Sequence, residues 1–429
     1  MLLKEKKEDS VFKNFGPAFL ILALGIGSGE FILWPYLTAN YGFGILWGAL
    51  LGITFQLFLI NLISRNTIIF KDNILGIFAK VFSGIYFWII FSTILGFGWP
   101  GFSSLTSELL VNGFGLDKSI FLPLSIFILI ISALILILSK SAYKKILFLE
   151  KIALSLLLFL SLFLFIFYFD FEEFKSLILG FFGIGENYNF LPKNIEIGLF
   201  LTTFLGAIAY AGSGGNLLLG NSFYLRKENS KEDNSSKEIK KVLKQNLLFF
   251  WTGGILIISM LSYVSYIVLK NKTGLEDDFS FLILESHIFS SDISPFIGYL
   301  FILLGAAALF GVQLGIFDFI GRITKHGKNS LEKFKNKYSD KQAYNGAIII
   351  SIFFGLLIFL IGIDKPKSLI IIGAVINSLS MGVIALLLLL VEIKKVPEKF
   401  KSKWNILGLV LSTIFYLTFF IYVAWQNLF

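Results

Sequence analysis

The stretch Gly25-Ile26-Gly27-Ser28-Gly29-Glu30 interrupts an apolar run that extends from residue 15 to residue 40. A second cluster, Gly212-Ser213-Gly214-Gly215-Asn216, interrupts another apolar run, from residue 195 to residue 220. Glycine costs up to about 1 kcal/mol per position relative to alanine inside a helix, so each cluster makes local unwinding cheap. Each cluster also contains a polar side chain, Glu30 or Asn216. We therefore expect two apolar helices that are broken in the middle.

Both runs belong to a series of apolar segments of about 18 to 25 residues, the length that a helix needs to cross a bilayer. With 56% hydrophobic and 15% charged residues, the 429-residue chain is more apolar than ordinary soluble proteins. The sequence predicts about eleven transmembrane helices, at residues 15–40, 43–64, 83–110, 120–138, 146–169, 195–220, 245–269, 293–320, 345–363, 368–391 and 404–425. We expect an all-α membrane protein that forms a single transmembrane domain over residues 1–429, with no signal peptide.

The distribution of lysine and arginine predicts the orientation, because cytoplasmic loops are enriched in these residues. If the N-terminus is cytoplasmic, 30 of the 37 basic residues fall in cytoplasmic segments. We therefore predict a multi-pass protein of the cell inner (cytoplasmic) membrane, with its C-terminus outside. The net charge of +9 then reflects topology and contact with the lipid bilayer, and we expect no nucleic-acid partner. The segment 226–244 is rich in Lys, Glu, Asn and Ser, and we predict a disordered cytoplasmic loop there.

The two glycine clusters occupy corresponding places in the two halves of the chain. Interrupted membrane helices free backbone N–H and C=O groups, which are tolerated only inside the protein or beside a cavity. Paired interruptions of this kind are typical of the substrate sites of secondary transporters, where helix N-termini face anions and free carbonyls face cations. The alternative is that the small residues only allow close packing between helices.

Only three of the 28 acidic residues lie well inside a predicted span: Glu30, Glu108 and Asp318. Charges in the bilayer are costly and by default indicate ion or proton pathways. Glu30 is predicted to ligate a cation or carry a coupling proton, or else to accept a hydrogen bond from freed N–H groups of the break. Asp318 is predicted either to take part in coupling or to pair with Arg322 on the same helix face. Glu108 follows four hydroxyl residues and lies in a hydrated pathway or at the outer interface.

The polar side chains of Gln313 and Asn377 lie near the middle of their spans and are further candidates for the site. The chain has no cysteine, and its two histidines, His287 and His326, lie outside the apolar runs. It contains no Walker-type nucleotide motif and no cluster of metal ligands in the spans. We expect neither an enzyme nor a cofactor; a divalent cation enters only as a substrate.

The residues around the first break resemble a known family. Residues 16–20, Gly-Pro-Ala-Phe-Leu, and residues 41–47, Tyr-Gly-Phe-Gly-Ile-Leu-Trp, look like helices 1 and 2 of the Nramp (natural resistance-associated macrophage protein) metal transporters. Asn216-Leu217-Leu218-Leu219 and the span count look similar too. The resemblance implies a LeuT-type fold with alternating access. It consists of inverted five-helix repeats at 15–169 and 195–391, plus an extra helix at 404–425. It also implies import of divalent metals, usually with protons.

Two motifs depart from the family pattern. The helix 1 motif Asp-Pro-Gly-Asn is replaced by Gly27, Ser28, Gly29 and Glu30, and the helix 6 motif Met-Pro-His by residues 213–215. Loss of the thioether favours harder cations such as magnesium, calcium or manganese. The predicted metal ligands are Glu30, Ser213, Asn216 and Gln313, with carbonyls of Gly27 and Ala211. The full set of predicted substrate-binding residues is Gly27, Ser28, Gly29, Glu30, Ala211, Ser213, Gly214, Gly215, Asn216, Gln313 and Asn377.

The glycine-rich break of helix 1 also resembles that of amino-acid permeases, where backbone N–H groups receive the substrate carboxylate. This leaves two functional hypotheses. In the first, the protein moves a divalent cation, with Glu30, Glu108 or Asp318 in coupling. In the second, it moves a small organic solute such as an amino acid, held in the room that glycine leaves. The oligomeric state stays open between a monomer and an oligomer.

Overall fold

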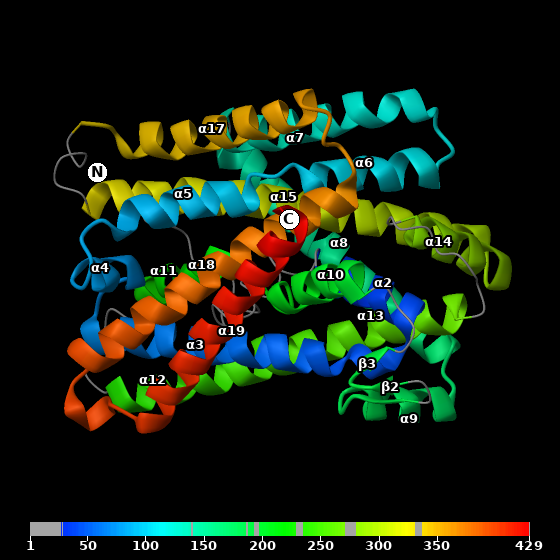
Figure 1. Cartoon of the computed structure of the whole chain (residues 1–429). Coiled ribbons are helices and arrows are strands. Elements are labelled where there is room, and N and C mark those ends of the chain that lie inside the picture. Colours follow the sequence, from blue (N-terminus) through cyan, green and yellow to red (C-terminus); the bar gives the residue numbers. More distant parts are fainter. Residues whose placement is uncertain are drawn as a thin grey trace.

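The computed structural model describes residues 27, 29–138, 140–185, 188–192, 197–228, 235–270, 280–330 and 337–428. Within these ranges the chain is almost entirely helical (Figure 1). The predicted site residue Ser28 and the first half of the predicted helix 1 lie outside the described residues.

The first half of the chain contains the helical elements η2 (Gly29–Leu33), α2 (Trp34–Tyr41), η3 (Phe43–Ile45), α3 (Trp47–Phe70), α4 (Ile74–Ala79), α5 (Ile85–Phe97), α6 (Gly101–Gly113), η4 (Lys118–Ile120), α7 (Phe121–Leu138), α8 (Lys140–Phe167) and α9 (Phe171–Gly180). Three two-residue strands follow, β1 (Ile184–Gly185), β2 (Tyr188–Asn189) and β3 (Leu191–Pro192). They form an antiparallel meander in which Ile184 pairs with Asn189 and Asn189 pairs with Leu191.

The second half contains α10 (Ile197–Ala209), η5 (Gly215–Leu219), α11 (Gly220–Glu228), α12 (Ser235–Gln245), η6 (Asn246–Thr252), α13 (Gly253–Leu269), α14 (Phe281–Asp292), α15 (Pro295–Ser330), α17 (Asp340–Leu360), α18 (Pro366–Lys394), η7 (Glu398–Phe400) and α19 (Lys403–Leu428). Proline stands at the first position of α15 and α18, where its missing N–H costs no helical hydrogen bond.

Eight helical segments among the described residues are long and apolar enough to cross a membrane. They match eight of the predicted spans, and α8 matches a ninth; α8 is followed after a bend of 120° by the short helix α9. The two remaining predicted spans are the ones that contain the glycine clusters. The second of these is divided into α10 and η5, which α11 follows, and the first is described only from its glycine cluster onward. The protein is therefore a multi-pass membrane protein.

The predicted disorder of residues 226–244 is wrong for residues 226–228, which belong to α11, and for residues 235–244, which belong to α12; residues 229–234 lie outside the described part. Ile239 and Val242 are one helical turn apart and pack with Ile68 and Leu225 in a small apolar cluster. The polar composition of the segment predicts disorder, but it does not take the spacing of the few apolar residues into account. Two or three apolar residues at helical spacing are enough to pack a helix against a neighbour.

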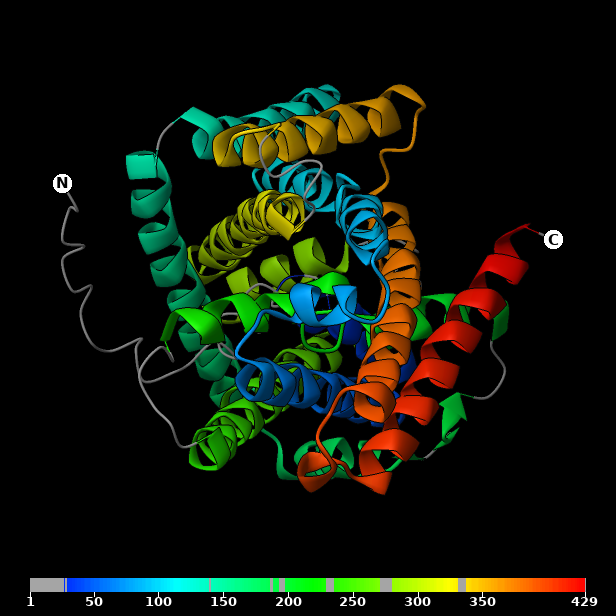
Figure 2. The ribbon, with the colours of Figure 1, turned by 90° about the vertical axis from the view of Figure 1, so that its left-hand side faces the viewer.

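Long helices run side by side across the molecule in Figure 1, with α4, α11 and α12 at one end and α9, β2, β3 and α14 at the other. Figure 2, viewed along this direction, shows α3, α5, α15 and α18 arranged around the middle of the assembly. Contacts place η5 against α3, α5 and α18. The second glycine cluster therefore occupies the middle of the helix assembly, where every backbone group must find a partner inside the protein.

Candidate functional site

The helix 6 break lies between the end of α10 and the start of η5. Tyr210 to Gly214 are irregular and completely buried. Gly212, Gly214 and Gly215 have φ angles of +119°, +71° and +50°, a region that favours glycine over residues with a side chain. The prediction that this helix is broken is confirmed, and the glycines supply the backbone conformation that the break requires.

A glutamine of α3 replaces the hydrogen bonds that the broken helix has lost. Gln56 Oε1 accepts hydrogen bonds from the N–H groups of Ser213 and Gly214, both at 3.0 Å. Its Nε2 donates to the carbonyl of Ala209 at 3.0 Å. Gln56 is fully buried, and one side chain thus satisfies backbone groups on both sides of the break. Sequence reasoning missed this residue, whose only signal is a lone amide within an otherwise apolar span.

Glu30 connects the two broken helices. It lies in η2, has no exposed surface, and its Oε1 accepts a hydrogen bond from the N–H of Gly212 at 2.8 Å. A Cβ atom on Gly29 would collide with the carbonyl of Tyr210, so the two breaks approach each other more closely than any larger residue would allow. The hydrogen bond that the sequence suggested for Glu30 therefore exists, but its donor belongs to helix 6.

Two buried amides attach the break to the neighbouring helices. Asn216 Nδ2 donates to Ser92 Oγ at 2.9 Å and to Thr93 Oγ1 at 2.8 Å, both on α5. On α18, Asn377 Nδ2 donates to the hydroxyl of Tyr210 at 3.1 Å and to a carbonyl of α5. Both amides point their nitrogen atoms at protein acceptors, which leaves their oxygen atoms available.

Five buried side-chain oxygen atoms from the predicted site have no hydrogen-bond partner among the described residues. They are Glu30 Oε2, Ser213 Oγ, Asn216 Oδ1, Gln313 Oε1 and Asn377 Oδ1. Leaving a buried polar group unsatisfied costs about 1–3 kcal/mol, so such atoms call for an explanation. Carboxylate, hydroxyl and amide oxygens are the ligands that hard cations prefer.

The candidate ligand set contains one acidic group. Among the residues that the structure describes, no group of three or more His, Asp and Glu side chains could hold a metal ion. Ala211 is buried against Gly52 of α3, and Gly27 faces the side chain of Val312, the neighbour of Gln313. Any cation at the break would therefore depend on Glu30 together with neutral oxygen atoms.

The other two predicted coupling acids lie away from these contacts. Asp318 of α15 accepts hydrogen bonds from Arg322 Nε at 2.6 Å and from the hydroxyl of Tyr344 at 2.7 Å. Its geometry is thus that of the predicted same-face ion pair. Glu108 is buried in α6, the helix that follows α5 along the chain, and α5 is the helix to which Asn216 is bonded.

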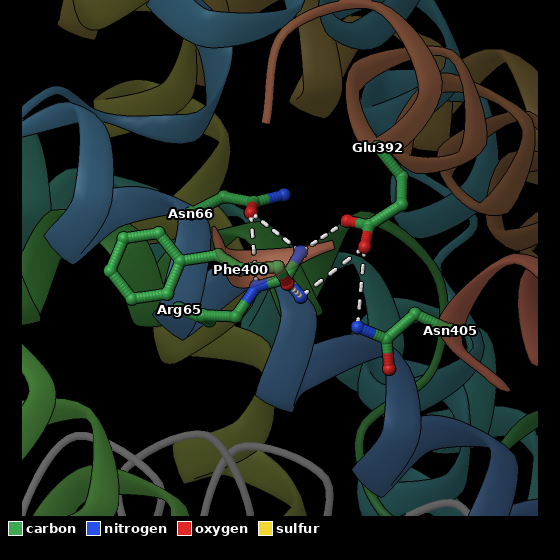
Figure 3. A network of polar contacts seen from close by, with 5 residues as sticks. All are labelled: Arg65, Asn66, Glu392, Phe400 and Asn405. Atoms are coloured by element: carbon green, nitrogen blue, oxygen red, sulfur yellow. Dashed lines mark hydrogen bonds and ion pairs between the residues drawn. The ribbon is translucent and has the colours of Figure 1, made fainter. Parts of the chain in front are cut away.

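A buried ion pair fastens α3 to α18 far from the break. Arg65 binds Glu392 and also donates to Asn66 Oδ1 at 3.0 Å and to the Phe400 carbonyl at 3.2 Å (Figure 3). Asn405 adds a hydrogen bond to Glu392 at 3.3 Å. Because α3 belongs to the predicted first repeat and α18 to the second, this network links the two halves at the end predicted to face the cytoplasm.

No protein-family model and no curated protein sequence matches the chain. Solved structures do. A mutant of the Eremococcus coleocola manganese transporter superposes with a TM-score of 0.70 at 14% identity, over 97% of this chain and 87% of that one. The fold is LeuT-type. Mhp1, a nucleobase-cation-symport-1 family transporter with bromovinylhydantoin bound, gives a TM-score of 0.59 at 12% identity, over 96% of this chain and 92% of that one. MhsT in complex with L-phenylalanine gives 0.53 at 17% identity, over 96% and 98%.

These likenesses confirm the predicted fold class. They include a metal transporter and proteins solved with organic ligands, so the fold is compatible with either predicted class of substrate. The choice between the two classes depends on the residues at the break.

Proposed function

We propose that this protein is a secondary active transporter that moves a hard divalent cation across the inner membrane by alternating access, with Glu30 as the charged ligand. The observation that carries the proposal is the set of unpartnered buried oxygen atoms of Glu30, Ser213, Asn216 and Asn377 at the helix 6 break, one of them the second carboxylate oxygen of Glu30. A single carboxylate with hydroxyl and amide oxygens suits magnesium, calcium or manganese, which accept oxygen ligands and retain water.

The contacts at the break favour a cation over a carboxylate-bearing solute. The N–H groups of Gly212, Ser213 and Gly214 already donate to Glu30 and Gln56. A substrate carboxylate would have to displace these acceptors, one of which is the carboxyl group of Glu30 itself.

The glycines do not leave the room that the organic-solute hypothesis requires. A Cβ atom on Gly29, Gly212, Gly214 or Gly215 would approach a neighbouring atom more closely than real Cβ atoms do. The glycines are needed for close approach and for the backbone conformation, and this close packing favours a small cation over an organic solute beside them.

The Nramp resemblance and the likeness to a manganese transporter support the same proposal. We also propose the inward N-terminus, the outward C-terminus and coupling to protons through Glu30 or Glu108. Asp318 is a weaker candidate for coupling, because Arg322 and Tyr344 already satisfy its carboxylate.

Uptake into proteoliposomes tests the proposal. Purified protein would be offered manganese, magnesium and calcium with an encapsulated metal-sensitive dye, with and without a proton gradient. Glu30→Gln removes the charge but keeps an oxygen that can accept from Gly212, so the break should stay intact. Glu172→Gln, an exposed position in α9, is the matched control.

We expect saturable uptake of at least one of these cations in the parent protein and in the Glu172→Gln control, and none in Glu30→Gln. Unchanged uptake in Glu30→Gln would remove Glu30 from the site. Folded protein that takes up no cation, but whose unfolding temperature rises with an amino acid, would favour the organic-solute alternative.

A further inference from the structure

The helix α14 carries a buried carboxyl group, Glu285, which is not part of either helix break. The Glu285 residue is only 2% exposed. Its helix has 12 residues and is not one of the segments long enough to cross a membrane. The hydroxyl of Ser265 in α13 forms a hydrogen bond with the carboxyl group, and Glu285 Oε1 has no partner among the described residues. A buried, nearly unpaired carboxyl group is costly in its charged form.

Glu285 lines a small cavity between α14 and the helices beneath it. The other residues of its lining are Phe31, Pro35, Ser161, Leu164, Leu261, Val264, Ser265, Leu282 and Phe301. Two serine hydroxyls are the only other polar side chains in this lining, and no second charged group is present in it. The cavity therefore offers Glu285 neither a counter-ion nor enough oxygen ligands for a metal ion.

The ionisable groups on the surrounding elements are engaged elsewhere. On α13, the Tyr263 hydroxyl bonds with Asp170. On α15, Tyr299 stacks on Phe114, and on α6 the acidic residue Glu108 is not part of the cavity lining. The charged residues of α8 lie in residues 140–151, in the first half of that helix and before its cavity-lining residues.

On α14 itself, His287 is exposed and Asp292 accepts a hydrogen bond from the Tyr168 hydroxyl at 3.0 Å. Lys367 lies over the ring of Tyr36 in α2 and donates to the Tyr36 hydroxyl at 3.1 Å. None of these groups lines the cavity of Glu285.

We propose that Glu285 is a proton-binding site, which holds a proton while α14 is closed over the outer half of helix 1 and releases it to water when the two separate. In the closed arrangement the proton occupies a carboxyl oxygen inside the cavity. On opening, the O–H bond breaks and the proton passes to an entering water molecule, which leaves a hydrated carboxylate. The ligand of this site is thus a proton.

The contacts around α14 explain how helix 1 would control this site. The ring of Phe281, the first residue of α14, lies 5.9 Å from the ring of Tyr36. Lys367, which contacts Tyr36, belongs to the first turn of α18. Phe31 and Pro35 line the cavity itself; Phe31 is the residue after Glu30, and Pro35 lies in the first turn of α2. Movement of this half of helix 1 away from α18 would disturb Tyr36 and open the cavity.

The titration has a definite sign. Burial raises the pKa of Glu285 to about 8, and the hydrogen bond from Ser265 opposes part of this shift. A carboxyl group whose pKa is higher in the closed state favours that state at low pH. The stabilisation of the closed state by this proton is fully present below the ordinary pKa of glutamate and is lost as the pH rises through about 8. The coupling of this proton to cation movement rests on the proposed function, whereas the binding of the proton does not.

Infrared difference spectroscopy of the protein in lipid bilayers tests the inference directly, because a protonated carboxyl group has its own C=O stretch. The parent protein, Glu285→Gln and the exposed control Glu172→Gln would be titrated from about pH 6 to about pH 10, around the expected midpoint. We expect a carboxyl band that disappears near pH 8 in the parent and the control and is absent from Glu285→Gln.

A second variant covers the case in which Glu285→Gln does not fold. Ser265→Ala removes the hydrogen bond that stabilises the charged form, so the midpoint should move to higher pH. The inference is overturned if the parent spectrum lacks the titrating band, if Glu285→Gln retains it, or if Ser265→Ala leaves its midpoint unchanged. The titration needs no transport, so a failure of cation uptake would reject the proposed function without affecting this result.

Discussion

Replacement of Gln56 by leucine should be among the most destabilising single substitutions of a buried amide in this protein. Gln56 accepts from two backbone N–H groups and donates to one carbonyl, all within the helix 6 break. Leucine has a similar size but can satisfy none of them. At about 1–3 kcal/mol for each unsatisfied buried group, the loss is about 3–9 kcal/mol, and relaxation of the break should keep it in the lower half of that range.

Gln313→Leu is the matched control. Gln313 is equally buried on a membrane helix, and its Oε1 has no hydrogen-bond partner among the described residues. Replacing an unpartnered polar group by an apolar one is neutral or stabilising. The unfolding free energies of both variants would be compared by denaturant unfolding in detergent micelles. Amide hydrogen exchange would report on the protection of the N–H groups of residues 212–214. Equal unfolding free energies for the two variants would refute the assignment of Gln56 to the break.

Three further substitutions test other parts of the account. Arg65→Met should cost about 3–5 kcal/mol of unfolding free energy because it leaves Glu392 buried without its partner, and adding Glu392→Leu should recover most of the loss; an additive double variant would contradict this. Gly29→Ala should abolish uptake by forcing the two breaks apart, whereas Gly346→Ala, which meets nothing within 4 Å, should leave uptake and stability unchanged. Glu30→Gln should lose uptake yet unfold within about 1 kcal/mol of the parent, because its amide oxygen preserves the hydrogen bond to the break.

The broken helix could be predicted because its cause is local. Three glycines within four residues lower the cost of unwinding wherever the rest of the chain places them. The apolar runs likewise predict the spans, since the bilayer requires continuous apolar helix. The position of Glu30 beside the break also followed from its place in the sequence.

The partners across the break could not be predicted in the same way. Gln56 is more than 150 residues from the backbone groups that it satisfies, and a single amide in an apolar span forms no periodic pattern. Glu285 was missed because only acids within the predicted spans were considered, whereas a 12-residue helix between spans buries this one. The charged composition of residues 226–244 led to a prediction of disorder for α12. The helix packs through Ile239 and Val242, whose helical spacing is a better indicator than the composition.

Anomalous scattering from crystals grown with manganese would locate the cation relative to Glu30. We predict a peak at the helix 6 break, about 2.0–2.6 Å from Glu30 Oε2, the distance range of oxygen ligands to hard divalent cations. The peak should also contact at least one oxygen from Ser213, Asn216, Gln313 or Asn377, and should vanish in Glu30→Gln. A peak away from Glu30, or no peak in protein that crystallises with both breaks intact, would contradict the account.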